Sequence, residues 1–264
     1  MFEKKFCLLL LAGMMVLSGG CRQGKVSITM AGSTAFQPFA EKLAEQFMTL
    51  HPNVSITVQG GGSALGIQSA ISGAADIGMA DLVTLPREAE QLTKSVVARD
   101  GIAVVVNPAN PVSDLTMTQV RDVFNGKLKD WQETGGNAHP ITVVSREAGS
   151  GTRSSFEQIV GGITLTGDAL IQDSNGTIRE TVANDQNAIG YLSHGLLSPK
   201  IKAVRVDGLE CSTDNIVAGK YTLVRPIYLL TKGTPVGEIR NFIDYVLSAE
   251  GQAMIKADGL IPTK

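Results

Sequence analysis

Along this chain, segments in which apolar residues recur every second position alternate with segments in which they recur every three or four positions. Val26–Met30 and Val54–Val58 alternate apolar and polar residues, which predicts two β-strands. Between them, apolar residues recur every three or four positions, which predicts a helix with Pro38 tolerated in its first turn. The apolar stripe of this helix consists of Phe36, Phe39, Ala40, Leu43, Ala44, Phe47 and Leu50. We expect the stripe to pack in the core rather than to bind a cofactor.

Strands and helices continue to alternate up to the C-terminus. Further strands are expected at about residues 76–81, 101–106, 141–144, 188–192 and 221–230, and Trp131 is assigned to a loop. Further helices are expected at about residues 64–72, 115–124, 154–160, 176–184, 212–218, 235–247 and 249–257. This order is typical of an α/β protein in which helices flank parallel sheets. In such sheets, ligands bind where loops leave the carboxyl ends of the strands.

Composition and charge narrow the classes of protein. With 264 residues, 43% of them hydrophobic, the chain can form one large core or two modest ones. The formal net charge of −2 offers no basic surface for a nucleic acid, so none is expected as a partner. A bound anion would therefore be held by local geometry.

The N-terminus has the features of an export signal. Lys4 and Lys5 precede the apolar stretch Phe6–Leu17, which is short for a membrane span, and small residues then lead to Cys21. This order resembles a bacterial lipoprotein signal, so we expect residues 1–20 to be removed and Cys21 to carry lipid. The alternative is an ordinary secretory peptide cut near Gly20, because the leucine that lipoprotein signals place three residues before the cysteine lies four before it here.

The cysteines agree with export and anchoring. Cys7 lies in the segment that would be removed, Cys21 would be lipidated, and Cys211 would remain alone, so no intramolecular disulfide is expected. No later apolar stretch approaches the length of a membrane span. We therefore expect a soluble domain in the cell envelope, facing the periplasm or the exterior and held to the membrane by its lipid.

Ser145–Arg153 has the strongest chemical signal in the chain. It joins an expected strand to an expected helix through Gly149 and Gly151, which let the backbone approach an oxyanion closely. Helix starts carry unpaired N–H groups, and Arg146 adds a permanent two-pronged positive charge. The alternative is a helix that is simply capped by Thr152 and binds no ligand.

Other loops add to this signal. Three further strand ends are rich in Gly, Ser and Thr or end in a charge, namely Gly32-Ser33-Thr34, Gly60-Gly61-Gly62-Ser63 and Ala80-Asp81. With the loop from Arg146 to Thr152, this makes four such loops, and a helix is expected to begin directly after three of them. Several donor-rich helix starts with one arginine and one carboxylate indicate an anion-binding site.

These motifs, in this order and spacing, resemble the phosphate-binding proteins of phosphate ABC transporters. The resemblance runs from about residue 26 to the C-terminus. It rests on Ala31–Ala35, Gly60–Ala64, Asp76–Asp81, Asp100–Asn107, Ser145–Arg153, Gly190-Tyr191 and Tyr221–Tyr228.

The resemblance implies an α/β, bilobed type II periplasmic-binding-protein fold, or Venus flytrap, with two crossover strands. The crossovers are expected near Val104–Asn107 and Val224–Tyr228. Lobe 1 would combine residues 26–105 with residues 226–264, and lobe 2 would comprise residues 106–225. Closure of the lobes would bury the ion.

The resemblance also implies a function and a set of site residues. The chain would bind inorganic phosphate outside the cytoplasm and deliver it to the permease of an ABC importer, as a monomer, with no catalytic residue, cofactor or metal. The phosphate-binding residues would be Thr34, the backbone N–H of Ala35, Ser63 and Asp81 from one lobe, with Arg146, Ser150, Gly151 and Thr152 from the other.

Asp81 would give the site its selectivity. Phosphate near neutral pH keeps at least one proton and sulfate keeps none, so a carboxylate accepts a hydrogen bond from phosphate and repels sulfate. Related proteins place an acid two residues after the arginine, where it orients the guanidinium, but this chain has Ala148 there. The adjacent Glu147 either takes over that role or lies in solvent.

Competing functions have less support in the sequence. A hydrolase needs a nucleophile and a base, and His51, His139 and His194 all fall in loops or at element ends. The chain has no nucleophile elbow, no phosphate-binding loop of nucleotide hydrolases and no Cys/His cluster with metal spacing. Two alternatives stay open, a binder of sulfate or molybdate and a phosphate sensor or adhesin without a transport role.

Overall fold

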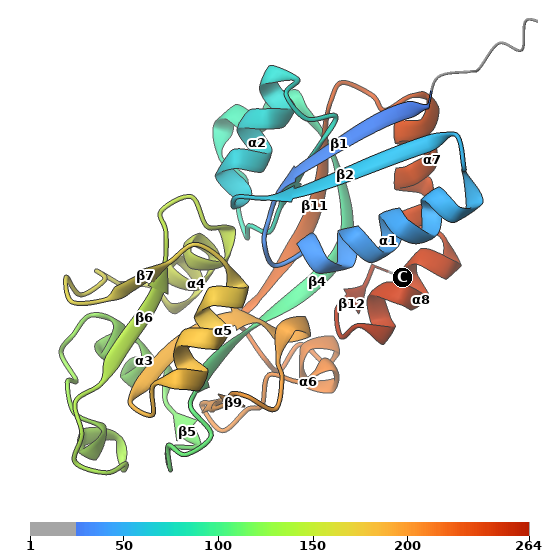
Figure 1. Cartoon of the computed structure of the whole chain (residues 1–264). Helices are drawn as coiled ribbons and strands as arrows, with labels where there is room; N and C mark the ends of the chain where they lie inside the picture. Colours follow the sequence, from blue (N-terminus) through green and yellow to red (C-terminus); the bar gives the residue numbers. More distant parts are fainter. Residues whose placement is uncertain (1–24, 264) are drawn as a thin grey trace, which may run out of the picture.

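A mixed sheet of ten strands runs through the whole of this computed structural model, which describes residues 25–263. The strands follow one another across the sheet in the order β2-β1-β3-β11-β4-β8-β6-β7, and β12 and β9 also pair with β4. Helices flank the sheet, with β1 and β2 in one half of the molecule and β6 and β7 in the other (Figure 1). The expected signal segment, residues 1–20, and Cys21 lie outside the described residues.

The order of elements matches the predicted alternation of strands and helices. The strands are β1 (Val26–Gly32), β2 (Val54–Gly60), β3 (Ile77–Ala80), β4 (Leu92–Val106), β5 (Asp114–Leu115), β6 (Thr142–Arg146), β7 (Leu170–Gln172), β8 (Ala188–Ser193), β9 (Lys202–Ala203), β10 (Arg205–Val206), β11 (Val224–Lys232) and β12 (Ile261–Pro262). The α-helices are α1 (Gln37–Leu50), α2 (Ser63–Ser72), α3 (Met117–Phe124), α4 (Gly151–Val160), α5 (Asn175–Asn184), α6 (Thr213–Val217), α7 (Gly237–Val246) and α8 (Ala249–Ala257). Short 3₁₀ helices are η1 (Arg87–Gln91), η2 (Trp131–Thr134) and η3 (His194–Leu196).

The sheet is parallel only in its two outer parts. Strand β1 pairs in parallel with β2 and β3, and β6 pairs in parallel with β7 and β8. In the middle, β11 is antiparallel to β3 and β4, and β4 is antiparallel to β8. The expectation of parallel sheets is therefore wrong at the centre, because β4 and β11 pass between the two halves in opposite directions.

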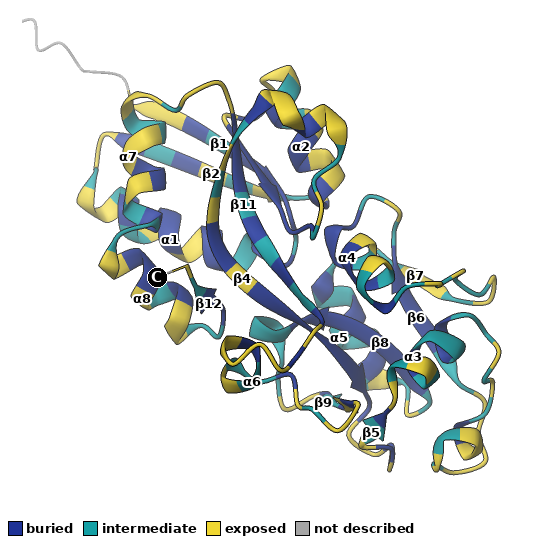
Figure 2. Ribbon diagram, turned by 180° about the vertical axis from the view of Figure 1, so that it is seen from behind, coloured by how far each residue is buried: buried dark blue, intermediate teal, exposed yellow. Residues whose placement is uncertain are grey.

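Two large apolar clusters lie on the two sides of this central region (Figure 2). The first packs α1, α7 and α8 against β1–β3 and contains Phe47, with Phe242 edge-on at a ring distance of 5.3 Å. The second contains Phe156 stacked on Tyr191 with a ring distance of 4.1 Å. The predicted stripe of α1 is confirmed as core apart from its last member, Leu50, which is 53% exposed.

The prediction of a loop position for Trp131 is wrong. Trp131 begins η2 and is 1% exposed, and its indole Nε1 donates to the carbonyl oxygen of Asn187 at 2.9 Å. The capping residue is Asp130, whose side chain accepts a hydrogen bond from the backbone N–H of Gln132 at 2.8 Å. A large buried indole thus anchors this segment to the second cluster.

Strand β4 belongs to both halves of the molecule. Its residues Leu92–Gly101 pair with β11, whereas Ile102–Val106 pair with β8. A Cβ atom on Gly101 would lie 2.6 Å from Cδ1 of Ile216 and 2.8 Å from Sγ of Cys211, so glycine permits the close packing at this change of partner. The strand begins at Leu92, nine residues before the predicted range 101–106. The prediction missed this first part because Lys94, Arg99 and Asp100 interrupt the apolar pattern there.

Cys211 is expected to react slowly in the folded protein. It is buried beside Gly101, and burial raises the pKa of its thiol. In a chain that starts at Arg22, where Cys211 is the one cysteine, iodoacetamide should label the folded protein at least about a hundredfold more slowly than the guanidinium-unfolded protein. Equal labelling rates, followed by mass spectrometry, would contradict this packing.

Candidate functional site

The loops singled out in the sequence meet where the two halves of the molecule face each other. Asp81 follows β3 in the first half, and its carboxylate lies against the start of α4 in the second. Oδ1 of Asp81 accepts a hydrogen bond from the Ser63 hydroxyl at 2.5 Å, and Oδ2 accepts one from the Thr152 hydroxyl at 3.1 Å. The Ser63 oxygen also accepts from the backbone N–H of Asp81 at 3.0 Å. Three of the predicted residues therefore form one buried polar cluster.

Gly151 allows this close approach. A Cβ atom at Gly151 would overlap both Oγ of Ser63 and Oδ1 of Asp81. Next to this contact, the backbone N–H of Ala64 donates to the carbonyl oxygen of Gly149 at 3.1 Å. The glycines of the turn thus bring the starts of α2 and α4 together, as close backbone approach requires.

Ser150, rather than Thr152, is the N-cap of α4. The Ser150 hydroxyl accepts a hydrogen bond from the backbone N–H of Arg153 at 3.2 Å, as N-cap residues commonly do. The alternative in which Thr152 merely caps the helix is therefore wrong. The Thr152 side chain is instead free to face Asp81, and the positive end of the helix points into the same space.

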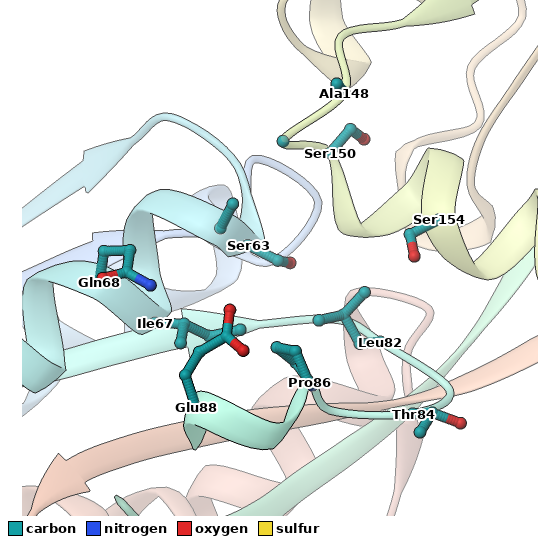
Figure 3. A pocket seen from close by; sticks show the side chains of 12 residues that line it. Ser63, Ile67, Gln68, Leu82, Thr84, Pro86, Glu88, Ala148, Ser150 and Ser154 are labelled. Carbon is teal, nitrogen blue, oxygen red and sulfur yellow. The ribbon is translucent and has the colours of Figure 1, made fainter. Parts of the chain in front are cut away.

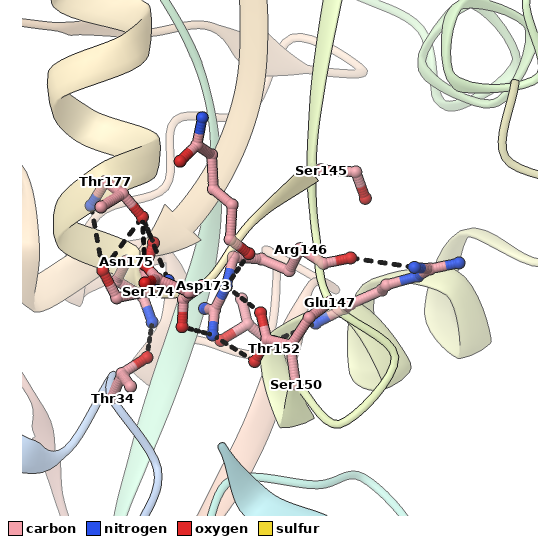
Figure 4. A network of polar contacts seen from close by, with 12 residues as sticks. Thr34, Ser145, Arg146, Glu147, Ser150, Thr152, Asp173, Ser174, Asn175 and Thr177 are labelled. Carbon is pink, nitrogen blue, oxygen red and sulfur yellow. Dashed lines mark hydrogen bonds and ion pairs between the residues drawn. The ribbon is translucent and has the colours of Figure 1, made fainter. Parts of the chain in front are cut away.

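Arg146 is buried at the end of β6 and is oriented by Glu147 (Figure 4). Its Nε and Nη2 atoms each donate to a different carboxylate oxygen of Glu147 at 2.9 Å. The same two nitrogens reach the backbone oxygens of Gln172 at 3.3 Å and Asp173 at 3.2 Å. Glu147 thus takes the orienting position that the sequence left open, and the acid does not have to come two residues after the arginine.

The third guanidinium nitrogen of Arg146 has no such partner. Among the described residues, no acceptor lies within hydrogen-bond distance of its buried Nη1 atom. Buried donors in proteins are nearly always paired, and a charged donor is costly to leave unpaired. This nitrogen indicates that the site is built to receive an acceptor.

Thr34 connects the first half of the molecule to α5. Nδ2 of Asn175 donates to the Thr34 hydroxyl at 3.1 Å (Figure 4). Oδ1 of Asn175 accepts from the backbone N–H of Ser193 at 3.0 Å. Ala35 is buried in the turn that precedes α1. Sequence reasoning missed Asn175, although the polar run Asp173–Thr177 at the start of α5 resembles the other helix starts in composition.

Sequence reasoning also missed Arg225 and Asp100. Nη2 of Arg225 contacts Oδ2 of Asp81 at 2.9 Å and Oδ2 of Asp100 at 2.8 Å. The Ser193 hydroxyl donates to Oδ1 of Asp100 at 2.9 Å. Burial raises the pKa of Asp100, and the nearby positive charge of Arg225 opposes that rise. The available signal was weak: an aspartate directly before the apolar run Gly101–Val106 and an arginine near the start of the expected strand 221–230.

A cavity of about 200 Å³ opens beside this cluster, between α2 and α4 (Figure 3). Ser63 and Ser150 line it, together with Glu88 from η1, whereas Thr34, Asp81 and Arg146 are not among its lining residues. The cavity therefore reaches the cluster from one side. Within residues 25–263, no group of three or more His, Cys, Asp or Glu side chains could hold a metal ion.

Comparisons with known proteins identify the family. A family model described as "PBP superfamily domain" matches residues 20–250. The chain is 35% identical over 241 residues to the phosphate-binding protein PstS of Bacillus subtilis strain 168, which covers 89% of this chain and 80% of that relative.

Solved structures agree with the sequence matches. A phosphate ABC transporter substrate-binding protein from Clostridium perfringens, with phosphate bound, has a TM-score of 0.86 at 40% identity and covers 90% of this chain and 100% of its own. An ABC-type phosphate transport receptor from Vibrio cholerae has a TM-score of 0.74 at 35% identity, over 89% of this chain and 99% of its own. The bilobed α/β fold expected from the sequence is confirmed. The chain belongs to the PBP superfamily and, within it, to the substrate-binding proteins of phosphate ABC transporters.

Proposed function

We propose that this protein binds inorganic phosphate between its two lobes, outside the cytoplasm, and delivers it to an ABC importer. The observation that carries the proposal is the buried Nη1 of Arg146, which has no hydrogen-bond partner among residues 25–263, just before the helix α4 whose Thr152 faces the Asp81 carboxylate. The names of the similar proteins support the same ligand. As predicted from the sequence, we take residues 26–105 with 226–264 as lobe 1 and residues 106–225 as lobe 2.

Each predicted residue has a role in holding the ion. Arg146 supplies charge, the hydroxyls of Thr34 and Ser150 supply rotatable donors, and the backbone N–H groups of Ala35 and Gly151 supply fixed ones. The hydroxyls of Ser63 and Thr152 each carry one proton, which they donate to Asp81 in this structure, and they turn toward the ion when it binds. Asp81 accepts the hydrogen bond from the proton that phosphate retains. Because this set comes from both lobes, a bound ion favours the closed arrangement.

The protein acts by binding alone in this proposal. It needs no catalytic residue, cofactor or metal, and its partners are phosphate, the ABC permease and, through lipid on Cys21, the membrane. It works as a monomer. Within residues 25–263, no helix has both the length and the apolar character required to cross a bilayer.

Calorimetry on residues 22–264 tests the ligand. We expect one phosphate per chain, and sulfate affinity lower by at least about a hundredfold, because a hydrogen bond to a charged group contributes about 1.5–3 kcal/mol and sulfate loses one and gains repulsion. Molybdate serves as a second comparison. Equal affinities for phosphate and sulfate would contradict the assignment of phosphate, and tighter binding of sulfate would favour the alternative oxyanion function.

Arg146→Ala tests the site, with Arg153→Ala as the matched control seven residues along. Arg153 lies at the surface of the cluster, where it donates to Glu157 at 2.7 Å and to the carbonyl oxygen of Arg146 at 2.9 Å. We expect Arg146→Ala to weaken phosphate binding by about a hundredfold or more and Arg153→Ala by less than about tenfold. Two variants that bind phosphate like the unmodified protein would show that the site lies elsewhere.

Cys21→Ser tests the membrane anchor. Without a thiol to carry lipid, the protein should appear in the soluble fraction or as uncut precursor, while the unmodified protein sediments with membranes. Immunoblots of both fractions distinguish the two. A Cys21→Ser protein that is still cut and still bound to membranes would exclude the lipid anchor.

A further inference from the structure

A buried ion cluster links the proposed anion site to the strands that connect the two lobes. Its members are Asp81, Arg225 and Asp100, and none of the three is more than 1% exposed. A single nitrogen, Nη2 of Arg225, makes both ion contacts, at 2.9 Å to Asp81 and 2.8 Å to Asp100. Ion pairs this deeply buried have little solvent screening, so loss of one partner leaves an uncompensated charge.

The position of the cluster ties it to both crossover strands. Arg225 on β11 lies directly opposite Asp100 on β4, one residue before β4 exchanges β11 for β8 as its partner. Ser193 on β8 donates to Asp100, and Thr152 on α4 donates to Asp81. Elements of both halves therefore converge on the same two carboxylates.

The contacts of Asp81 differ between its two oxygens. Oδ2 accepts from Thr152 and contacts Arg225, and these two contacts use both acceptor directions of Oδ2. Oδ1 accepts only from Ser63 among the described residues. A carboxylate oxygen can accept two hydrogen bonds. Within the described part of the chain, Oδ1 is thus the oxygen with an acceptor direction that no hydrogen bond uses, and it is the one that can accept the proton of a bound anion.

We propose that Arg225 is a specificity-determining positioning residue, which fixes the direction of the Asp81 carboxylate and compensates its charge so that Asp81 distinguishes protonated from unprotonated oxyanions. This inference rests on the proposed function, because it concerns how the phosphate site rejects sulfate. In this role Arg225 acts through Asp81, which it contacts with Nη2, while its Nε and Nη1 have no hydrogen-bond partner among residues 25–263.

The neighbours of the cluster decide what happens when Arg225 is removed. The neighbours of Asp81 are the guanidinium of Arg225 on β11 and the hydroxyls of Ser63 on α2 and Thr152 on α4. Asp100 on β4 contacts the same guanidinium. Asp100 in turn lies near the Cys211 thiol. Without the cation, two buried carboxyls share the space, and such pairs relieve their repulsion by binding a proton. A protonated carboxyl donates a hydrogen bond and no longer rejects sulfate.

The test compares phosphate and sulfate affinities of Arg225→Met with those of the unmodified protein by calorimetry. We expect the phosphate-to-sulfate affinity ratio to fall by about tenfold or more. Sulfate stays unprotonated across the range, so its affinity for Arg225→Met should rise as the pH is lowered from about 8 to about 5.5, because repulsion between two buried carboxyls raises the pKa at which the pair binds a proton. Arg225→Lys, which keeps a positive charge, should restore most of the ratio.

Two further variants separate this role from a structural one. Asp100→Asn keeps the contact between Arg225 and Asp81, so its ratio should stay within about threefold of the unmodified protein. If Arg225→Met alone does not fold, the double variant Arg225→Met with Asp100→Asn removes one charge of each sign and should still lower the ratio, because Asp81 loses its only cation within the cluster.

The outcomes are distinct. An unmodified protein without preference for phosphate contradicts the proposed function, whatever the variants do. A selective unmodified protein, together with Arg225→Met or double-variant proteins whose ratio is unchanged, overturns the role of Arg225 alone. Equal losses of phosphate and sulfate affinity leave the ratio unchanged and overturn it as well, since they mark a residue that only supports the fold.

Discussion

The burial of the Asp81 carboxylate is the constraint on which the rest of this structure depends. A carboxylate removed from water has to be compensated by hydrogen bonds and an opposite charge. Here the partners come from three separate elements, with Ser63 at the start of α2, Thr152 in α4 and Arg225 in β11. No single lobe supplies them all, so the fold has to bring its two halves together to satisfy one side chain.

This requirement explains several local features. Gly151 is needed where α4 meets Ser63 and Asp81, and Ser150 caps that helix so that Thr152 can face the carboxylate. The antiparallel pair of β4 and β11 places Asp100 opposite Arg225. The buried charges of Asp81, Arg225 and Asp100 thus lie at the strands that join the two apolar clusters, so the same strands hold the fold together and position the site.

Much of the fold and part of the site could be predicted from the sequence, because their signals are local. The strands, the helices and the glycine-rich helix starts each depend on residues a few positions apart, and the stripe of α1 packs as its spacing indicates. Arg225 and Asp100 carry only a weak local signal, since the two residues lie 125 positions apart along the chain and strand pairing brings them together. Asn175 is missed for a similar reason, as its contact with Thr34 spans 141 residues. Trp131 is misplaced because a short 3₁₀ segment has no periodicity that would separate it from a loop.

The pairing of Arg146 with Glu147 has a consequence for how relatives of this protein are found. The acid that orients the arginine stands one position after it here, with Ala148 where the resemblance led us to expect the acid, yet both carboxylate oxygens reach the guanidinium at 2.9 Å. A search pattern that fixes the acid at one place in the motif would reject this chain. In this chain the guanidinium is oriented by a contact in space, and the position along the sequence that supplies the carboxylate differs from the one expected.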